Sequence, residues 1–510
     1  MPENIIKKIK DSILPQWKVC FLWALGVGLV AHFYKLTNWL PNWDSLVFRY
    51  DEQNMVAMGR WFLPVASAPS SFYDLPWLAG LTAIIFTALG AVCICKMFAV
   101  EKKLTAALIG AAAASFPTVA SVLMYNYVAD SYSLSFLLAC VAALLLVSKK
   151  PQYVLSAILI ALSVGIYQAY ITVTIMLLLC YLIVELMKDG TKVKTTLIDS
   201  GRFLLTGIGG MALYYGILTV ILKITGETLL EYQGFDSAAS LSGIDLWASL
   251  YVIKESFVNF FFDFSKGINA FGAINVIILA LTLVFYLVEI IKNKLGAVKI
   301  ALLILFTAFL PIGASVLSLI NSSIDYHNLM KMGFFIFYLL FILQYEKAEC
   351  KKPLLGALKS WSILVVTAAL IFTQIVIANV SYHKLNMAYE KSYGVLIRIA
   401  DRIEQTEGAN ECNRIMVVGA LENSEAYNAY LPPNMTGSTD GYILRADDEI
   451  VGQSVLCSAL NDYCGKDYTF VYGKEKTELL KKVKANNMTN WPEKDSICVI
   501  DDVIVIKLSD

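Results

Sequence analysis

Long apolar runs recur along the first 380 residues and are separated by short polar stretches. Each run approaches the roughly 20 residues that a helix needs to cross a bilayer. The continuous run over 151–187 is divided at Tyr167-Gln168, because one helix of that length would overshoot the bilayer. The pattern predicts about eleven transmembrane helices, near residues 17–38, 77–99, 104–124, 131–148, 151–167, 170–187, 203–224, 270–291, 298–320, 330–345 and 361–380.

Residues 381–510 follow a different pattern. Apolar residues at helical spacing predict a helix over 395–403, and 477–485 predicts another. The stretches 414–419 (RIMVVG) and 496–508 (SICVIDDVIVIKL) are typical of strands. We therefore expect a transmembrane domain over 1–380, with long outside loops at 39–76 and 226–268, followed by a small soluble α/β domain over 381–510.

Positive charges indicate how the predicted helices are oriented. With the N-terminus taken as cytoplasmic, the short inside loops carry basic pairs such as Lys102-Lys103, Lys149-Lys150 and Lys351-Lys352. The outside loops are longer and hold fewer Lys and Arg residues, which agrees with the positive-inside rule. An odd number of spans then places the C-terminal domain on the extracytoplasmic face.

Composition supports a membrane protein and gives little sign of an ionic partner. The chain is 57% hydrophobic and only 16% charged, whereas a soluble domain has about a quarter charged residues. Acidic and basic residues are equal at 41 each, and we expect no nucleic-acid partner. Four cysteines in an exported domain fit two disulfides, with Cys457–Cys464 and Cys412–Cys498 as one of three pairings.

The first outside loop concentrates charged residues directly after the first predicted span. It reads NWDSLVFRYDEQNMVAMGRWFLP over 42–64. An arginine at this depth suits a phosphate near the headgroups, because a guanidinium matches phosphate oxygens. A carboxylate suits a general base that activates a hydroxyl. The competing interpretation is a solvated loop whose charges pair with one another. The charged candidates are Asp44, Arg49, Asp51, Glu52 and Arg60.

Two further outside turns carry polar and aromatic residues. Asp130 ends the turn MYNYVAD, where it is a candidate to bind a hydroxyl group beside Tyr127. Tyr167 and Gln168 form the turn that divides the 151–187 run. The alternative interpretations are structural: the tyrosines belong to an aromatic belt at the membrane interface, and Gln168 hydrogen-bonds to the backbone of the turn.

The last outside loop before the C-terminal domain is also polar, reading NSSIDYHNLMK over 321–331. Lys331 is a second candidate to bind a phosphate, with His327 beside it. A lone histidine is more often an ordinary loop residue. Convergence of Arg60 and Lys331 in space would favour a shared phosphate site.

The short motifs of this chain resemble those of a known family. NWDSL (42–46), QNMVAMGRWFL (53–63) and GIYQ (165–168) are similar to stretches in the bacterial Gtr-type glucosyltransferases of the GT-C superfamily. The resemblance implies a GT-C-like enzyme of the bacterial cytoplasmic membrane that transfers glucose from undecaprenyl-phosphate glucose to a cell-surface glycan. It makes Asp44 the first choice for the catalytic base. Many relatives carry an adjacent acidic pair where this chain has Asp44 alone, so Asp51 and Glu52 come second, as alternative sources of the other carboxylate. We expect no cofactor, with a divalent metal as the alternative.

Other functions make different demands on the sequence. A transporter or flippase for a lipid-linked sugar or another envelope component needs charged groups in mid-span, and these are nearly absent here. A non-enzymatic scaffold would leave the loop over 44–60 tolerant of mutation. We therefore expect a hexosyltransferase that uses a polyprenyl-phosphate-linked donor and a surface glycan or wall polymer as acceptor. A carboxylate base and direct displacement would invert the anomeric centre.

Overall fold

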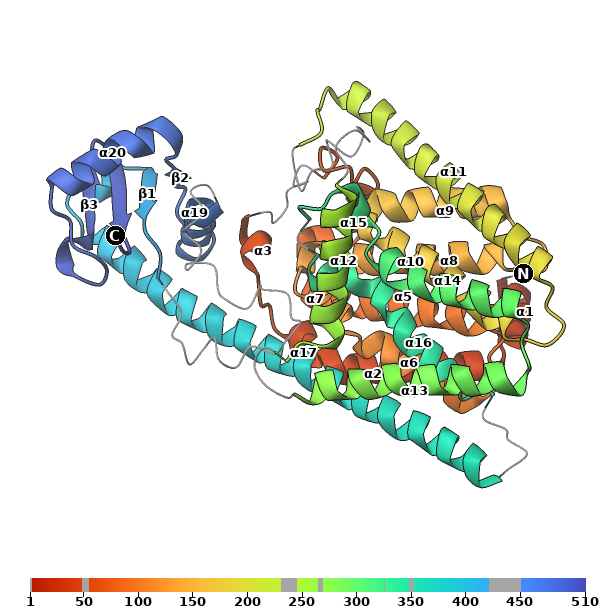
Figure 1. Cartoon of the computed structure of the whole chain (residues 1–510). Coiled ribbons are helices and arrows are strands. Elements are labelled where there is room, and N and C mark those ends of the chain that lie inside the picture. The colour runs from red at the N-terminus through yellow and green to blue at the C-terminus, as the bar shows by residue number, and fades with distance from the viewer. Residues whose placement is uncertain are drawn as a thin grey trace. The chain divides into compact units, whose positions relative to one another are not determined.

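The computed structural model describes residues 2–47, 55–230, 245–264, 269–324, 326–347, 353–421 and 451–510. The chain divides into two compact units. Figure 1 labels helices and strands of both units. The first unit comprises Met1–Thr37 and Glu52–Asn379, and the second comprises Asn38–Asp51 and Val380–Asp510.

The first unit is a bundle of helices. Helices α8, α9 and α10 run side by side in it (Figure 1), and α2 packs closely on α5 and α6. Its helices are α1 (Pro2–Ser12), α2 (Pro15–Thr37), α4 (Leu63–Ser67), α5 (Pro76–Met97), α6 (Lys103–Ser115), α7 (Pro117–Leu123), α8 (Ala129–Leu146), α9 (Tyr153–Ile166), α10 (Ile171–Leu186), α11 (Val193–Thr225), α12 (Leu246–Phe261), α13 (Ala270–Lys292), α14 (Ala297–Ala314), α15 (Leu317–Ile320), α16 (Phe335–Leu343) and the first part of α17 (Pro353–Glu404).

All eleven predicted stretches fall on helices. Eight helices in the described part of the chain are long and apolar enough to cross a membrane, and the bent pair α6–α7 would be a ninth. The remaining two stretches fall on shorter apolar helices, Tyr153–Ile166 and Asn328–Leu343. The 43° bend between α6 and α7 lies at Phe116, whose ψ of 137° is the extended conformation that a following proline imposes. The chain is thus a multi-pass helical membrane protein.

Small residues let these helices approach closely. A Cβ at Gly28 of α2 would lie 2.7 Å from Ile84 of α5, and one at Gly110 of α6 would collide with the carbonyl oxygen of Cys20 of α2. Lipid tails are as apolar as the helix surfaces, so helix association in a bilayer relies on such close packing.

The second unit is an α/β domain around a four-stranded sheet. Strand order is β2-β1-β4-β3, with β1 parallel to β2 and β4, and β3 antiparallel to β4. The β3–β4 hairpin turns at Asp501-Asp502, both with positive φ. Its elements are α3 (Trp43–Val47), the end of α17, β1 (Arg414–Val418), α19 (Val451–Cys464), β2 (Thr469–Phe470), α20 (Gly473–Ala485), β3 (Ile497–Ile500) and β4 (Val503–Lys507).

Each face of the sheet carries its own core. One core joins Ile415 and Ile504 to Leu396 of α17 and Val455 of α19. The other joins alternate residues of the same strands to Leu479 and Val483 of α20. The alternation explains why these strands were predictable, and the predicted helices over 395–403 and 477–485 are also confirmed. The first of them is the end of α17, a single helix of 52 residues that also contains the predicted span 361–380.

The predicted disulfides are wrong. The structure has free thiols at Cys412, Cys457, Cys464 and Cys498. Cys457 and Cys464 lie seven residues apart on α19, about 10 Å along the axis, which exceeds the reach of a disulfide. Cys412 and Cys498 pack against opposite cores of the sheet. Burial raises the pKa of the Cys457 thiol to about 11.

The close contact of α2 and α6 predicts a sharp difference between two glycines. Gly110→Val should lower the free energy of unfolding by about 1–3 kcal/mol, because the side chain must displace backbone. Gly26→Val on α2 is the matched control, since its Cβ meets nothing within 4 Å. Thermal unfolding of the purified protein in detergent measures both; equal effects would contradict this account of the packing.

Candidate active site

Two of the motifs that carry the family resemblance contact each other in the first unit. The segment 55–63 lies against the turn formed by Gly165 and the 3₁₀ helix η3 (Gln168–Tyr170). Phe62 donates its backbone N–H to the carbonyl of Gly165 at 2.8 Å. The Gln168 side-chain amide donates to the carbonyl of Met58 at 2.9 Å. A Cβ at Gly165 would meet the ring of Trp61 at 2.7 Å, so only glycine lets this ring lie there.

Gly59 fixes the path of the segment. Its φ of +77° lies in the left-handed region that favours glycine. Its carbonyl accepts a 2.8 Å hydrogen bond from the hydroxyl of Tyr214 on α11. A Cβ here would lie 2.7 Å from that hydroxyl and 2.9 Å from the Gln168 amide. The next residue, Arg60, is therefore held in one place.

Arg60 lies on a stack of tyrosines. Its guanidinium carbon is 5.1 Å from the ring centroid of Tyr167. The Tyr167 ring is parallel to that of Tyr132 on α8, with centroids 4.4 Å apart and an interplanar angle of 2°. The cation–π contact stabilises the half-buried guanidinium beside the Tyr167 ring. The arrangement is suited to present a positive charge at a defined position.

Asp130 is a buried carboxylate in the first turn of α8, with 4% of its surface exposed. It accepts hydrogen bonds from the hydroxyls of Ser70 and Ser131. Ser70 directly precedes η1 (Ser71–Tyr73), which packs on η2 (Asn126–Val128). Tyr127 lies in η2. The loop that follows α2 is thus bound to the start of α8 by the predicted carboxylate Asp130.

A second polar cluster in these same elements was not predicted from the sequence. Lys35, in the last turn of α2, is 1% exposed and donates a 2.9 Å hydrogen bond to the side-chain oxygen of Asn126. Asp74, which is 4% exposed and follows η1 with a φ of +53°, attracts the Lys35 ammonium electrostatically. A lysine at the end of a span resembles an interfacial anchor, and only the fold reveals its partners.

Lys331 is buried, with its ammonium 5.8 Å from the ring centroid of Phe260 on α12. It lies in η6 (Asn328–Phe334), which packs against η3 and α10. His327 directly precedes η6 and is half-buried. Arg60 and Lys331 therefore lie on segments that both contact the turn at Gln168–Tyr170.

The remaining predicted residues lie elsewhere. Asp44 belongs to the second unit, where it is half-buried in α3, a short helix that packs on α19 and buries Leu46 in the core. Arg49, Asp51 and Glu52 lie outside the described residues.

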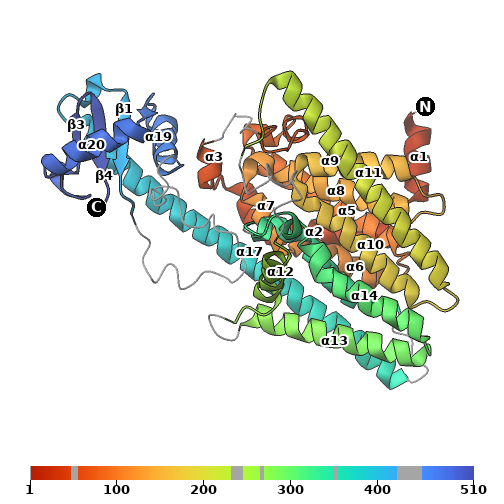
Figure 2. The ribbon, with the colours of Figure 1, turned by 45° about the horizontal axis from the view of Figure 1, so that its top comes forward.

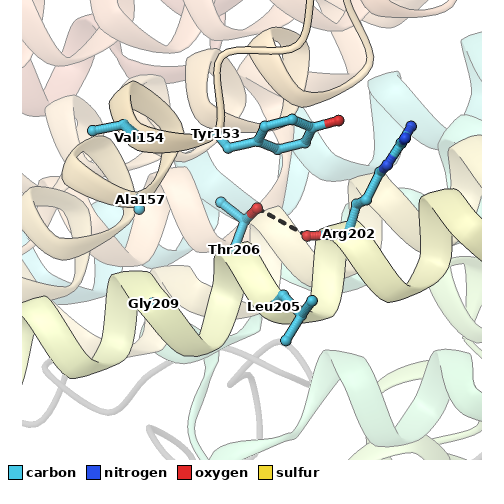
Figure 3. Close-up of a pocket in the computed structure, with 7 residues that line it drawn as sticks. All are labelled: Tyr153, Val154, Ala157, Arg202, Leu205, Thr206 and Gly209. Atoms are coloured by element: carbon cyan, nitrogen blue, oxygen red, sulfur yellow. Dashed lines mark hydrogen bonds between the residues drawn. The ribbon is translucent and has the colours of Figure 1, made fainter.

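A separate hollow lies between α9 and α11, and Figure 3 shows Tyr153 and Arg202 at its sides. It has a volume of about 460 Å³ and contains none of the predicted residues. Among the described residues, no group of three or more His, Cys, Asp or Glu side chains is arranged to hold a metal ion.

The apolar helices define a multi-pass membrane protein. Its loops form a polar site that contains Arg60, the stacked tyrosines and the buried carboxylate of Asp130. The particular family follows from comparison: the family model for the glucosyl transferase GtrII matches residues 33–344, so the chain belongs to that family and is a glycosyltransferase. No curated protein and no solved structure matches the chain.

The close packing around Gly59 predicts that substitution here is tolerated far less than at Gly190, a glycine with almost the same φ. Gly59→Ala and Gly190→Ala should each lose about 1 kcal/mol to backbone strain, because their φ values are +77° and +78°. Only Gly59→Ala adds a collision with Tyr214 and Gln168. We expect it to lower thermal stability further and to reduce sugar transfer, while Gly190→Ala transfers normally. Equal transfer by the two variants would contradict the docking role of Gly59.

Proposed function

We propose that this glycosyltransferase moves a hexose, namely glucose, from a polyprenyl-phosphate-linked donor to a cell-surface glycan or wall polymer at the extracytoplasmic face. The observation that carries the proposal is the GtrII family match, which spans both motifs that dock at Gly59 and Gln168. The scarcity of mid-span charges in the sequence favours this function over a transporter.

The donor phosphate becomes the leaving group and gains negative charge as the sugar departs. Cations that are held in position before the reaction stabilise such charge best. We assign this role to Arg60, whose orientation on Tyr167 supports it, with Lys331 and Arg49 as further phosphate ligands. A guanidinium offers two parallel N–H groups to phosphate oxygens, and the ammonium of Lys331 adds a point charge.

The acceptor hydroxyl needs a base. We assign Asp44 first and Asp51 or Glu52 second to remove its proton. The hydroxyl oxygen then attacks the anomeric carbon, and the bond to the phosphate oxygen breaks with its electrons going to the polyprenyl phosphate. Sugar and acceptor hydroxyls are assigned to Asp130, Tyr127, Tyr167, Gln168 and His327.

The base assignment predicts a large kinetic effect. Asp44→Asn should lower the rate of transfer from synthetic polyprenyl-phosphate glucose by about 10²–10⁴-fold with folding unchanged, because general-base catalysis is worth that much. Asp51→Asn and Glu52→Gln are measured beside it. Glu407→Gln, an exposed carboxylate of the second unit, is the matched control and should transfer at the wild-type rate. Full activity in all three loop variants would remove the assignment.

Direct displacement also predicts the stereochemistry of the product. A β-linked donor should give an α-linked product, because the hydroxyl attacks opposite the departing phosphate. NMR of the product's anomeric proton measures the outcome. Retention of the β configuration, or a trapped sugar–enzyme adduct, would exclude this mechanism.

A further inference from the structure

An apolar groove of about 560 Å³ lies along α11 in the first unit. Helices α10 and α11 supply most of its lining, and α14, which lies on the other side of α10 from α11 (Figure 2), adds Phe306. The α11 wall runs from Phe203 past Gly207 and Met211 to Tyr215, a spacing that places these residues on one face of the helix. From Phe203 to Tyr215 the wall is about 18 Å long.

One end of the groove adjoins the candidate active site. Tyr215 lines the groove, and its neighbour Tyr214 donates to Gly59 and accepts from Gln168. Ile171, which begins α10 directly after η3, lines the same end. The groove therefore starts within one residue of the groups that hold Arg60 in place.

The groove is open to the surroundings of the bundle. Leu204 and Ile208 on its α11 wall are 65% and 56% exposed. A Cβ at Gly207 meets nothing within 4 Å, so the wall has unfilled space at mid-length. A long apolar chain can thus enter from the side, whereas a glycan acceptor finds almost no polar partner there.

We propose that this groove holds the isoprenoid chain of the lipid-linked donor, an inference that rests on the proposed function. Transfer of the chain from lipid to the groove gains little from the hydrophobic effect, since both surroundings are apolar. The gain is orientation: a chain fixed in the groove restricts where its phosphate lies beside Arg60, and restricted geometry accelerates transfer.

The test compares two donors, undecaprenyl-phosphate glucose and the same glucosyl phosphate carried on two isoprene units. Gly207→Trp should fill the groove and lower kcat/KM for the long donor by about tenfold while changing that for the short donor less than about twofold. Gly201→Trp on the same helix is the matched control, because its Cβ also meets nothing within 4 Å and it does not line the groove. Gly207→Leu repeats the test if the tryptophan variant does not fold.

A second apolar groove of about 690 Å³, lined by α13, α14 and α16, is the rival site. Ala308→Trp fills it and should leave the preference for the long donor intact. The inference is overturned if Gly207→Trp keeps that preference, if it slows both donors equally, or if Ala308→Trp is the variant that removes it. Absence of transfer from either donor by the wild-type protein would instead remove the proposed function and the groove with it.

Discussion

The contact of the 55–63 segment with the turn at Gly165–Tyr170 is the constraint on which the site depends. It requires two glycines for different reasons: Gly59 for a left-handed backbone and Gly165 for the space that the Trp61 ring occupies. Because Tyr214 and Gln168 close around Gly59, the loop after the first span is tied to helices more than a hundred residues later. Arg60 is oriented by this anchoring before any substrate arrives.

The same principle operates at the start of α8. Asp130 holds Ser70, and Asn126 holds Lys35, so two polar contacts bind the first loop and the first span to one short segment. Each contact is buried, and polar groups removed from water are costly unless they are paired. These pairs therefore specify one arrangement of the loop where apolar packing alone would allow several.

Much of the fold was predictable because it follows local rules. Apolar length identified the helices, and alternation identified β1, β3 and β4. The site was predictable only in part. Motif resemblance directed attention to Arg60 and Gln168, whereas the partner of Lys35 lies 91 residues away in a different loop. No periodicity encodes such a pairing. Periodicity predicted two helices, at 361–380 and 395–403, where the structure has the single helix α17. Helical spacing on both sides of a junction does not reveal whether the helix is interrupted between them.

The hydrogen bond between Lys35 and Asn126 has a consequence for how the protein is made. Ribosomes complete the first span before Asn126 exists, and at about 5–20 residues per second the 91 residues added after Lys35, up to and including Asn126, take several seconds or more. During that interval the ammonium of Lys35 relies on water or on Asp74, which is made earlier, with its long side chain extended toward the membrane surface. The first helix gains this contact only after the third predicted span has been made. Formation of this hydrogen bond is thus a late step in biogenesis, set by the arrival of a single amide.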